Sequence, residues 1–369
     1  FMGMLESLDM EWKTTVCKVL DIAAECTPKK AAEYALEELL APDEGFTEIA
    51  RDAAGKRYVN TIEESGELEE AKTLPTAQDV FLVTGGGRGV TYLCALELAK
   101  KYKSKFILAG HTPDDRDLTW MKNETNPDKL RPVLLAKLKA EGKTMKPAEV
   151  DALIRESLYQ KMVRDNIEEM NKTGAKAIYM YCDVRDDASM KKAVAEGEKA
   201  FGKITGFIHG AGALADKTID RKTQDDFHTV FDTKVLGLEN CMKHLDRKAL
   251  KYLVMFSSVA AYFGNQAQAD YAMANEILNK YALQYKVLYP NTEVMAINWG
   301  PWEGGMVNDT LKRLLKAKKT TMIGFDTGAT MFAEQFAYKL APGKGEFLIS
   351  GLDKPLSHDI DFDLHDLIN

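Results

Sequence analysis

The sequence has few of the residues that mark disulfide-bonded, metal-binding or membrane proteins. Its five cysteines are scattered and form no C-x-x-C pair, and its six histidines show no metal-ligand spacing. We therefore expect free thiols in a reducing compartment, a cytoplasmic location and no metal site. The longest apolar runs are much shorter than the roughly 20 residues of a membrane-spanning helix, so no membrane partner is expected.

Basic residues are outnumbered by acidic ones. The 49 Lys and Arg against 56 Asp and Glu leave a formal net charge of −7, which argues against a nucleic-acid partner. The first residues, FMGMLESLDMEWK, are too acidic and their apolar run is too short for a signal peptide. Because the sequence opens Phe1-Met2-Gly3 rather than with Met, we expect an excised piece of a longer polypeptide.

Seven short apolar runs dominate the chain from residue 80 onward, and segments of helical periodicity separate most of them. They are VFLVT (80–84), KFILAG (105–110), AIYMYCDV (177–184), GFIHGAG (206–212), KYLVMFSS (251–258), EVMAINWG (293–300) and EFLISG (346–351). Continuous apolar strands that alternate with helices form a parallel sheet covered on both faces. The sequence therefore predicts an α/β, Rossmann-like, doubly wound, seven-stranded parallel sheet over residues 80–351.

Residues 1–79 precede this pattern and predict a small helical and hairpin extension. Apolar spacing favours helix over 5–40, with Thr27 as a helix N-cap. The next segment favours a small hairpin that turns near Gly55, and acidic residues 63–79 are typical of a linker.

Two further segments depart from the strand–helix alternation. Residues 112–172 separate the second and third strands and are much longer than an ordinary crossover. Their charged, helix-forming composition predicts a helical insertion of two or three helices. That insertion is either a solvated decoration or a contact surface for a neighbouring domain or subunit. Residues 352–369 are acidic and are interpreted as a C-terminal linker.

The stretch VFLVTGGGRGVTYLCALELAKKY joins a strand to a helix through a glycine-rich turn. Glycines let the backbone approach a pyrophosphate, and a helix N-terminus presents free N–H groups to it. A glycine-rich string alone is weak evidence, but its position after the first strand strengthens the hypothesis of a dinucleotide site. The candidate contacts are Thr84, Gly85, Gly87, Arg88, Gly89 and Val90.

The end of the second strand favours NADPH over NADH. An acidic residue there would bind the free ribose 2′-hydroxyl, but the chain has Gly110-His111-Thr112. Arg88 is placed to meet a 2′-phosphate, although it could equally face solvent. Further cofactor contacts are expected after the third strand, where Asp183 would meet the adenine amino group, and along the HGAG segment after the fourth. These candidates are Cys182, Asp183, Val184, Gly210, Ala211 and Gly212.

Ser258 and Tyr271 have the chemistry that carbonyl reduction requires. A tyrosine can give a proton to the carbonyl oxygen if a nearby ammonium stabilises the phenolate, and a serine hydroxyl can polarise the carbonyl. A lysine normally follows such a tyrosine by one helical turn, but Asn275 stands there. Lys234, on the helix between the fourth and fifth strands, is predicted to supply the ammonium. Taken singly, it is more often a solvated lysine.

With this exchange of lysine and asparagine, the chain resembles the ketoreductase domains of modular polyketide and polyunsaturated fatty acid synthases, within the short-chain dehydrogenase/reductase superfamily. The motifs that carry the resemblance are VTGGGRGVT, HGAGALADK, TKVLG, MFSSVAAYFGNQAQADYAMAN and NWGPWEGGM. The insertion is more similar to the polyunsaturated fatty acid synthase type. Residues 46–62 are similar to the last hairpin of the structural subdomain that precedes such domains.

The resemblance implies a reaction, its partners and further site residues. The reaction is reduction of a 3-ketoacyl chain, tethered through phosphopantetheine to an acyl carrier protein, beside neighbouring synthase domains. Ser258, Tyr271, Lys234 and Asn275 match the catalytic positions. Gly300, Pro301 and Met306 match the segment beside the nicotinamide and the start of a mobile lid over 303–325, a stretch that could also be an ordinary surface helix.

The resemblance also implies a product configuration. Relatives that form the D-hydroxyl carry Leu-Asp-Asp after the fourth strand, and this chain keeps the second Asp as Asp216. Phe263 replaces the tryptophan of the opposite class, and Gln268 is a third expected substrate-side residue. The product is therefore predicted to be 3R. Thr91 replaces a loop glycine and His111 replaces an arginine expected at the 2′-phosphate, which leaves Arg88, with His111 or Arg116, to bind it.

Two other functions fit parts of the sequence. One is a stand-alone reductase of small ketones, which the unusual N-terminus and the acidic tail count against. The other is a non-catalytic scaffold domain, which would be expected to lose the glycine loop or the tyrosine; this chain keeps both.

Overall fold

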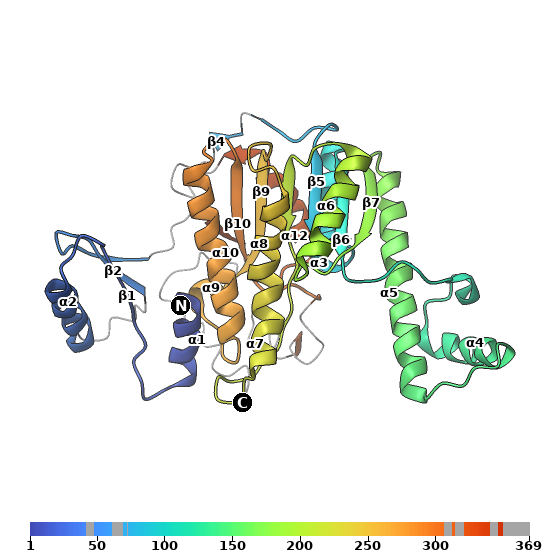
Figure 1. The fold of residues 1–369 in the computed structure, drawn as a ribbon, viewed down its shortest axis with the longest axis horizontal. Coiled ribbons are helices and arrows are strands. Elements are labelled where there is room, and N and C mark those ends of the chain that lie inside the picture. The colour runs from blue at the N-terminus through green and yellow to red at the C-terminus, as the bar shows by residue number, and fades with distance from the viewer. Residues whose placement is uncertain are drawn as a thin grey trace.

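The computed structural model describes residues 1–41, 48–60, 69–71, 73–305, 312–313, 321–339 and 346–349 (Figure 1). A parallel sheet of seven strands forms its centre, in the order β12-β10-β9-β8-β5-β6-β7. The strands are β5 (Val80–Thr84), β6 (Lys105–Gly110), β7 (Lys176–Tyr181), β8 (Gly206–His209), β9 (Tyr252–Ser258), β10 (Glu293–Trp299) and β12 (Glu346–Ile349). The predicted doubly wound sheet is confirmed.

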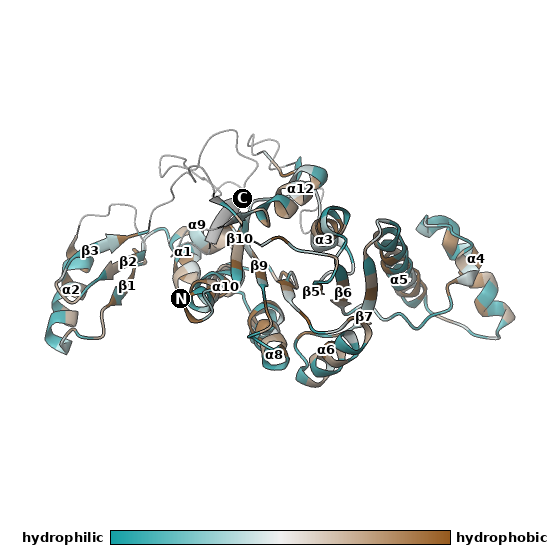
Figure 2. Cartoon of the chain, turned by 90° about the horizontal axis from the view of Figure 1, so that it is seen from above, coloured by the Kyte–Doolittle hydropathy of each residue, from teal (hydrophilic) through white to brown (hydrophobic). Residues whose placement is uncertain are grey.

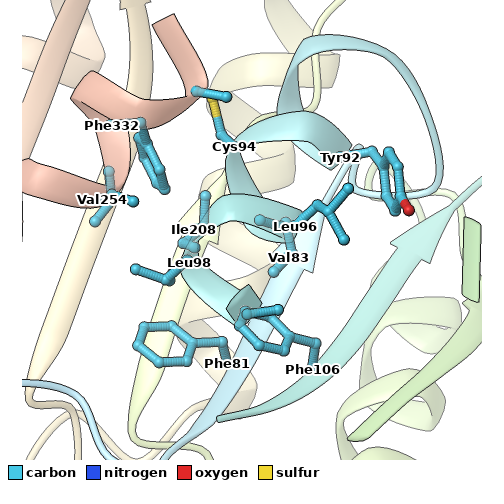
Figure 3. Close-up of a cluster of buried hydrophobic side chains, with 14 of the residues drawn as sticks. Phe81, Val83, Tyr92, Cys94, Leu96, Leu98, Phe106, Ile208, Val254 and Phe332 are labelled. Carbon is cyan, nitrogen blue, oxygen red and sulfur yellow. The ribbon is translucent and has the colours of Figure 1, made fainter. Parts of the chain in front are cut away.

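Helices cover both faces of this sheet, which explains why its strands are apolar throughout (Figure 2). On one face, α3 (Gly89–Tyr102) and α12 (Phe325–Gln335) pack over β5 and its neighbours, with Phe81, Phe106 and Phe332 in the shared core (Figure 3). The second core lies under α6 (Asp187–Phe201), α8 (Gly237–His244) and α10 (Ala269–Leu288). Because the strands are parallel, their carboxyl ends lie at one edge of the sheet.

The N-terminal extension contains a strand that the helical spacing of the sequence did not predict. Its elements are α1 (Met2–Glu11), β1 (Val19–Ile22), α2 (Pro28–Leu40), β2 (Glu48–Arg51) and β3 (Arg57–Val59). The helix predicted over 5–40 is therefore wrong at β1, which pairs in parallel with β2. The Thr27 cap and the hairpin turn are confirmed, because Thr27 accepts a hydrogen bond from Lys30 N and Gly55 adopts a φ of +88°.

One short strand lies within the predicted linker 63–79. This strand, β4 (Glu69–Glu70), pairs antiparallel with β11 (Tyr338–Lys339). The strand pair joins the linker to the segment after α12.

Helix α1 packs against α9 (Ala260–Phe263) and α10. The contact is close: a Cβ placed on Gly3 would lie 2.5 Å from the carbonyl oxygen of Ala272. The Glu11 carboxylate accepts hydrogen bonds from Ile219 N at 2.8 Å and Ala267 N at 2.9 Å. Ala267 has a φ of +66°, an unfavourable conformation for a residue with a Cβ. Thus α1 braces the loop between α9 and α10.

The insertion forms two long helices, α4 (Pro127–Ala140) and α5 (Pro147–Lys172), after a short 3₁₀ turn, η1 (Thr119–Met121). The prediction of two or three helices is confirmed. Met121, Leu130 and Val150 belong to a small apolar core of their own. Helix α5 runs alongside the edge strand β7 (Figures 1 and 2), and it also contacts α3.

The five cysteines, all in the described part of the chain, are free thiols. Among the described residues, none of the helices has the length and apolar character needed to cross a bilayer.

Candidate active site

The candidate residues gather where the strands end. In a doubly wound sheet the ligand site lies outside the carboxyl ends, where the strand order reverses. Here the reversal lies between β5 and β8, which are neighbours in the sheet although other strands separate them in sequence. The glycine loop leaves β5 at this point and the HGAG segment leaves β8, so the topology brings the two motifs together.

The glycine loop has the backbone geometry of an anion cradle. Gly85 and Gly89 both have a φ of +68°, and a Cβ on Gly85 would lie 2.8 Å from the Gly210 carbonyl oxygen. Helix α3 begins after the loop without a side-chain cap, and a Cβ on Gly89 would meet nothing within 4 Å. Uncapped N–H groups beside open space fit the pyrophosphate of a dinucleotide.

Thr91 fits in place of the expected glycine because its neighbour lacks a side chain. A Cβ on Gly210 would lie 2.4 Å from the Thr91 Cγ2 atom, and the Thr91 hydroxyl is 3.4 Å from the Gly210 carbonyl oxygen. Gly210, just after β8, therefore leaves room for the Thr91 side chain. The close approach of helix and strand is kept.

Thr84 and Val90 occupy the two ends of the loop. Thr84 ends β5 fully buried, and its hydroxyl lies 2.8 Å from His209 Nδ1. Val90 is half-buried, and its Cγ2 atom lies 3.3 Å from a Cβ placed on Gly305. The segment after β10 thus reaches the glycine loop.

The residues after β6 and β7 have different surroundings. His111 is exposed, and Asp183, which is half-buried, forms a salt bridge of 2.7 Å with Arg185 that lowers the pKa of its carboxyl. The Cys182 thiol is buried against Met190, and the Val184 side chain is buried against α8. Cys182 and Val184 can therefore meet a cofactor only through their backbone.

Arg88 does not simply face solvent. Its guanidinium lies over the ring of Tyr159 on α5, 4.4 Å from the ring centroid. The insertion thus contacts the glycine loop directly.

Lys234 is buried beside Tyr271. It lies in η2 (Asp232–Leu236), a π-helical turn between α7 (Gln224–Phe231) and α8, and its side chain is only 3% exposed. Its Nζ donates to the Phe256 carbonyl oxygen at 2.9 Å and lies 5.7 Å from the Tyr271 ring centroid. Burial lowers the pKa of the Lys234 ammonium to about 7. The interpretation of Lys234 as a solvated lysine is therefore excluded.

Tyr271 and Ser258 are hydrogen-bonded through their side chains. Ser258, at the end of β9, accepts a bond from Ala260 N at 3.2 Å, which leaves its hydroxyl hydrogen free for the tyrosine oxygen. Burial raises the pKa of Tyr271, and the bonds from Ser258 and Asn275 lower it by less. The tyrosine is therefore a neutral phenol, able to donate a proton.

Asn275 completes the group from one turn further along α10. Its Nδ2 donates to the Tyr271 carbonyl oxygen at 2.8 Å, while its Oδ1 is buried without a hydrogen-bond partner. A buried acceptor of this kind ordinarily has a partner, so Oδ1 is available to a group that enters the site. The structure thus brings Ser258, Tyr271, Lys234 and Asn275 together from three elements.

His209 was missed by the sequence analysis, although it heads the HGAG motif. It is fully buried, and burial together with the Lys234 charge lowers its pKa to about 3. Its Nε2 lies 2.9 Å from the Lys234 carbonyl oxygen, which can only accept, so Nε2 carries the hydrogen and Nδ1 accepts from Thr84. Neutral His209 therefore links the glycine loop to the π turn.

A second missed feature is the buried ion pair between Lys222 and Asp270. Their atoms approach to 2.9 Å, the side chains are 3% and 2% exposed, and Lys222 also donates to the Ala215 carbonyl oxygen. Asp270 in turn accepts from Tyr271 N. The pair fixes the segment after β8 to the start of α10, next to the tyrosine.

The predicted substrate-side residues lie at this junction. Gln268 Nε2 donates to both carboxylate oxygens of Asp216 at 3.1 Å, and desolvation of that carboxylate raises its pKa. Phe263, at the end of α9, is half-buried and makes an edge contact with Tyr262.

Of the predicted nicotinamide-side residues, Gly300 and Pro301 follow β10, where Ile323 N donates to the Pro301 carbonyl oxygen at 2.8 Å. Ala211 and Gly212 follow β8 at the same edge of the sheet. Met306 and most of the predicted lid over 303–325 lie outside the described residues.

Comparison with known proteins found a matching family model and several relatives. A family model described as "KR domain" matches residues 80–304. A subunit of the polyunsaturated fatty acid synthase of Thraustochytrium sp. is 32% identical over 348 residues, covering 90% of this chain and 12% of the relative. The chain therefore spans about an eighth of that relative's length.

Solved structures share the fold. A crystal structure of an N-terminal ketoreductase from the macrolactin assembly line aligns with a TM-score of 0.70 and 20% identity, covering 95% of this chain and 59% of that one. A blue fluorescent protein from a metagenomic library, in complex with NADPH, aligns with a TM-score of 0.55 and 14% identity, covering 74% of this chain and 96% of that one.

Proposed function

The chain belongs to the KR domain family, the ketoreductase domains of polyketide and polyunsaturated fatty acid synthases within the short-chain dehydrogenase/reductase superfamily, and from this membership we propose its reaction. The reaction is reduction of a 3-ketoacyl thioester, carried on an acyl carrier protein, to the 3R-hydroxyacyl thioester with NADPH. The observation that carries the proposal is the convergence of Ser258, Tyr271, Lys234 and Asn275.

Each of these side chains has a distinct role in the proposal. The cofactor supplies a hydride to the carbonyl carbon when it is bound. Ser258 and Tyr271 donate hydrogen bonds to the carbonyl oxygen, and Tyr271 transfers its proton there as negative charge develops. The Lys234 ammonium stabilises the remaining phenolate, because it is held beside the ring in a buried, weakly screened site.

The choice of NADPH follows from the residues around the cradle. No acidic residue follows β6 at Gly110-His111-Thr112, where a carboxylate would favour NADH. Arg88 has no carboxylate partner among the residues that the structure describes, so its charge is available to a 2′-phosphate. A protein of the same fold is known in complex with NADPH.

The 3R product and the carrier-bound substrate follow from the resemblance of the motifs and from the similarity to a component of a fatty acid synthase. Asp216 and Gln268 form the substrate-side pair, next to the catalytic tyrosine. If this pair guides the acyl chain, Asp216→Ala should lower the 3R excess in the product, which chiral chromatography of the hydroxyacyl product measures.

The proposed function is tested by following NADPH oxidation at 340 nm with a 3-ketoacyl N-acetylcysteamine thioester and with the same acyl group on a carrier protein. NADH is the parallel donor. Lys234→Ala and Tyr271→Phe are compared with Lys243→Ala and Tyr281→Phe, which change the same residue types on α8 and α10, away from the site. Circular dichroism checks that every variant is folded.

We expect the wild type and both control variants to reduce the thioester, and both site variants to lose activity by about 100-fold or more. Full activity in Lys234→Ala would refute the assignment of the moved lysine. A wild type that reduces small free ketones but neither thioester would indicate a stand-alone reductase. A folded wild type that is inert on every ketone would indicate a scaffold domain.

A further inference from the structure

Helix α5 of the insertion is fastened to the glycine loop. Asn166 Nδ2 donates to the Gly87 carbonyl oxygen at 2.9 Å. The buried Tyr92, in the first turn of α3, donates its hydroxyl hydrogen toward α5, where the Asn166 carbonyl oxygen lies at 3.0 Å and Glu169 Oε2 at 2.7 Å. The loop and the start of α3 therefore cannot shift without breaking contacts to the insertion.

The same helix holds the segment that follows β6. Gln160 is 1% exposed and accepts from Arg116 N at 3.3 Å. Arg164 pairs with Asp114 and donates to the Arg116 carbonyl oxygen at 3.1 Å. In a doubly wound fold the glycine loop and this segment flank the ribose that carries the 2′-phosphate. Helix α5 thus fixes both sides of that ribose site.

Tyr179 of β7 lies between the glycine loop and the segment after β6, and it is close to Arg88. Its ring is 2.9 Å from a Cβ placed on Gly87, and its hydroxyl is 3.1 Å from Thr112 N and 3.0 Å from the Thr112 carbonyl oxygen. Burial raises the pKa of Tyr179 to about 12, and the charge of Arg88 acts to lower it. Arg88 is therefore close enough to influence the phenol that caps the segment after β6.

Arg88 is the cation best placed to serve a 2′-phosphate. Arg116 forms a salt bridge with Glu156, and the charge of His111 acts on the Asp183 carboxyl, whose pKa it helps to lower after the larger effect of Arg185. Arg88 instead lies over the half-buried ring of Tyr159, 4.4 Å from the ring centroid, a contact that uses no N–H of the guanidinium in an ion pair with a carboxylate.

We propose that Tyr159 is a positioning residue for cofactor selection: its ring holds the Arg88 guanidinium at the 2′-phosphate site, so that the insertion forms part of the NADPH site. This inference rests on the proposed use of NADPH. A free arginine side chain loses rotamer freedom when it binds an anion, and a ring that already holds it removes most of that cost. The insertion is then neither decoration nor only a contact surface.

The test measures nucleotide binding to the full chain without any ketone, by the change in nicotinamide fluorescence. NADPH and NADH are titrated into wild type, Tyr159→Leu, Tyr159→Phe and Met162→Ala, the last a change on the exposed face of α5. We expect Tyr159→Leu to weaken NADPH binding about tenfold and to leave NADH binding unchanged. Tyr159→Phe keeps the ring and should bind as the wild type does, as should Met162→Ala.

A second pair of variants tests whether Tyr159 acts through Arg88. Arg88→Leu should weaken NADPH binding, and adding Tyr159→Leu should weaken it no further. An equal loss for NADPH and NADH would overturn the proposal, because it would indicate a general structural role for the ring. So would a Tyr159→Leu effect that persists without Arg88. If Tyr159→Leu fails the circular dichroism check, Tyr159→Gln replaces it.

The outcome is independent of catalysis. A wild type that reduces no ketone would refute the proposed function and leave the binding comparison intact. A wild type that binds NADPH and NADH equally would overturn this inference and the choice of cofactor, while ketone reduction with NADH could still be measured.

Discussion

Reduction should be lost as the pH rises through the pKa of Lys234. The proposed reaction leaves a phenolate on Tyr271, and only the ammonium form of Lys234 stabilises that charge. Because burial lowers the Lys234 pKa from 10.5 to about 7, this form disappears within the range where most lysines remain fully charged.

The size of the effect follows from the same pKa. With a value of about 7, about nine-tenths of the lysine is charged at pH 6 and about one-tenth at pH 8, so kcat should fall about tenfold between them. His209, with a pKa of about 3, does not titrate in this range, and Tyr271 stays protonated because burial raises its pKa. Lys234 is thus the group in this hydrogen-bonded cluster that can produce the loss.

The assay is kcat from pH 6 to 9 at saturating NADPH and thioester, for wild type and Lys234→Arg. A guanidinium stays protonated throughout, so the variant should have a lower but flat kcat, because the larger group fits poorly in a site that is 3% exposed. A wild-type kcat that is constant to pH 9 would refute the reasoning. So would the same decline in Lys234→Arg.

Three further predictions concern stability and the rim of the site. Lys234→Met should be inactive, but at pH 6 it should be more stable to urea than the wild type by a few kcal/mol. The lowered pKa means that burying the charged lysine costs about 5 kcal/mol, and the loss of its hydrogen bond to the Phe256 carbonyl offsets part of the gain. Between pH 7 and 10.5, Lys234 binds a proton in the unfolded chain but not in the native one, so this residue makes the wild type more stable as the pH rises. The difference in unfolding free energy between Lys234→Met and the wild type should therefore shrink. A difference that stays constant with pH would contradict the lowered pKa. His209→Phe should lower the free energy of unfolding by about 1–3 kcal/mol, because it removes the hydrogen bond to the Lys234 carbonyl oxygen and leaves the buried Thr84 hydroxyl without its acceptor. Thr84→Val should cost less, and equal losses in urea titrations would argue against the His209 link. Glu11→Ala should speed amide hydrogen exchange at Ile219 and Ala267 and raise KM for the carrier-bound thioester. Glu11→Gln keeps one acceptor oxygen, so its exchange rates should lie between those of Glu11→Ala and the wild type. Unchanged exchange in Glu11→Ala would show that α1 does not brace the loop.

The sheet could be predicted from the sequence because its strands are buried on both faces, and buried strands are apolar whatever they pack against. Val19–Ile22 could not be predicted as a strand in the same way. It is four residues long, and what makes it a strand is its pairing with Glu48–Arg51, far along the chain. Local periodicity contains no information about such a partner.

Some features of the site could likewise be predicted from local spacing, and others depend on contacts between distant segments. Tyr271 and Asn275 are one helical turn apart, so their spacing alone predicts a shared helix face. The π turn that carries Lys234, and the bond that His209 makes to its carbonyl, depend on how one helix meets one strand end. The contact between Arg88 and Tyr159 likewise depends on where the insertion folds back, and no spacing rule predicts that.

The contacts of helix α1 affect which residues must be included when this domain is moved into another protein. The span that the family model matches begins at residue 80, yet Glu11 accepts hydrogen bonds from two backbone N–H groups inside that span, those of Ile219 and Ala267. A chimaera that contained only the matched span would keep Ser258, Tyr271, Lys234 and Asn275 but would lack the helix that contacts the neighbouring loop. An exchange of this domain between synthases should therefore carry α1 together with the span that the family model matches.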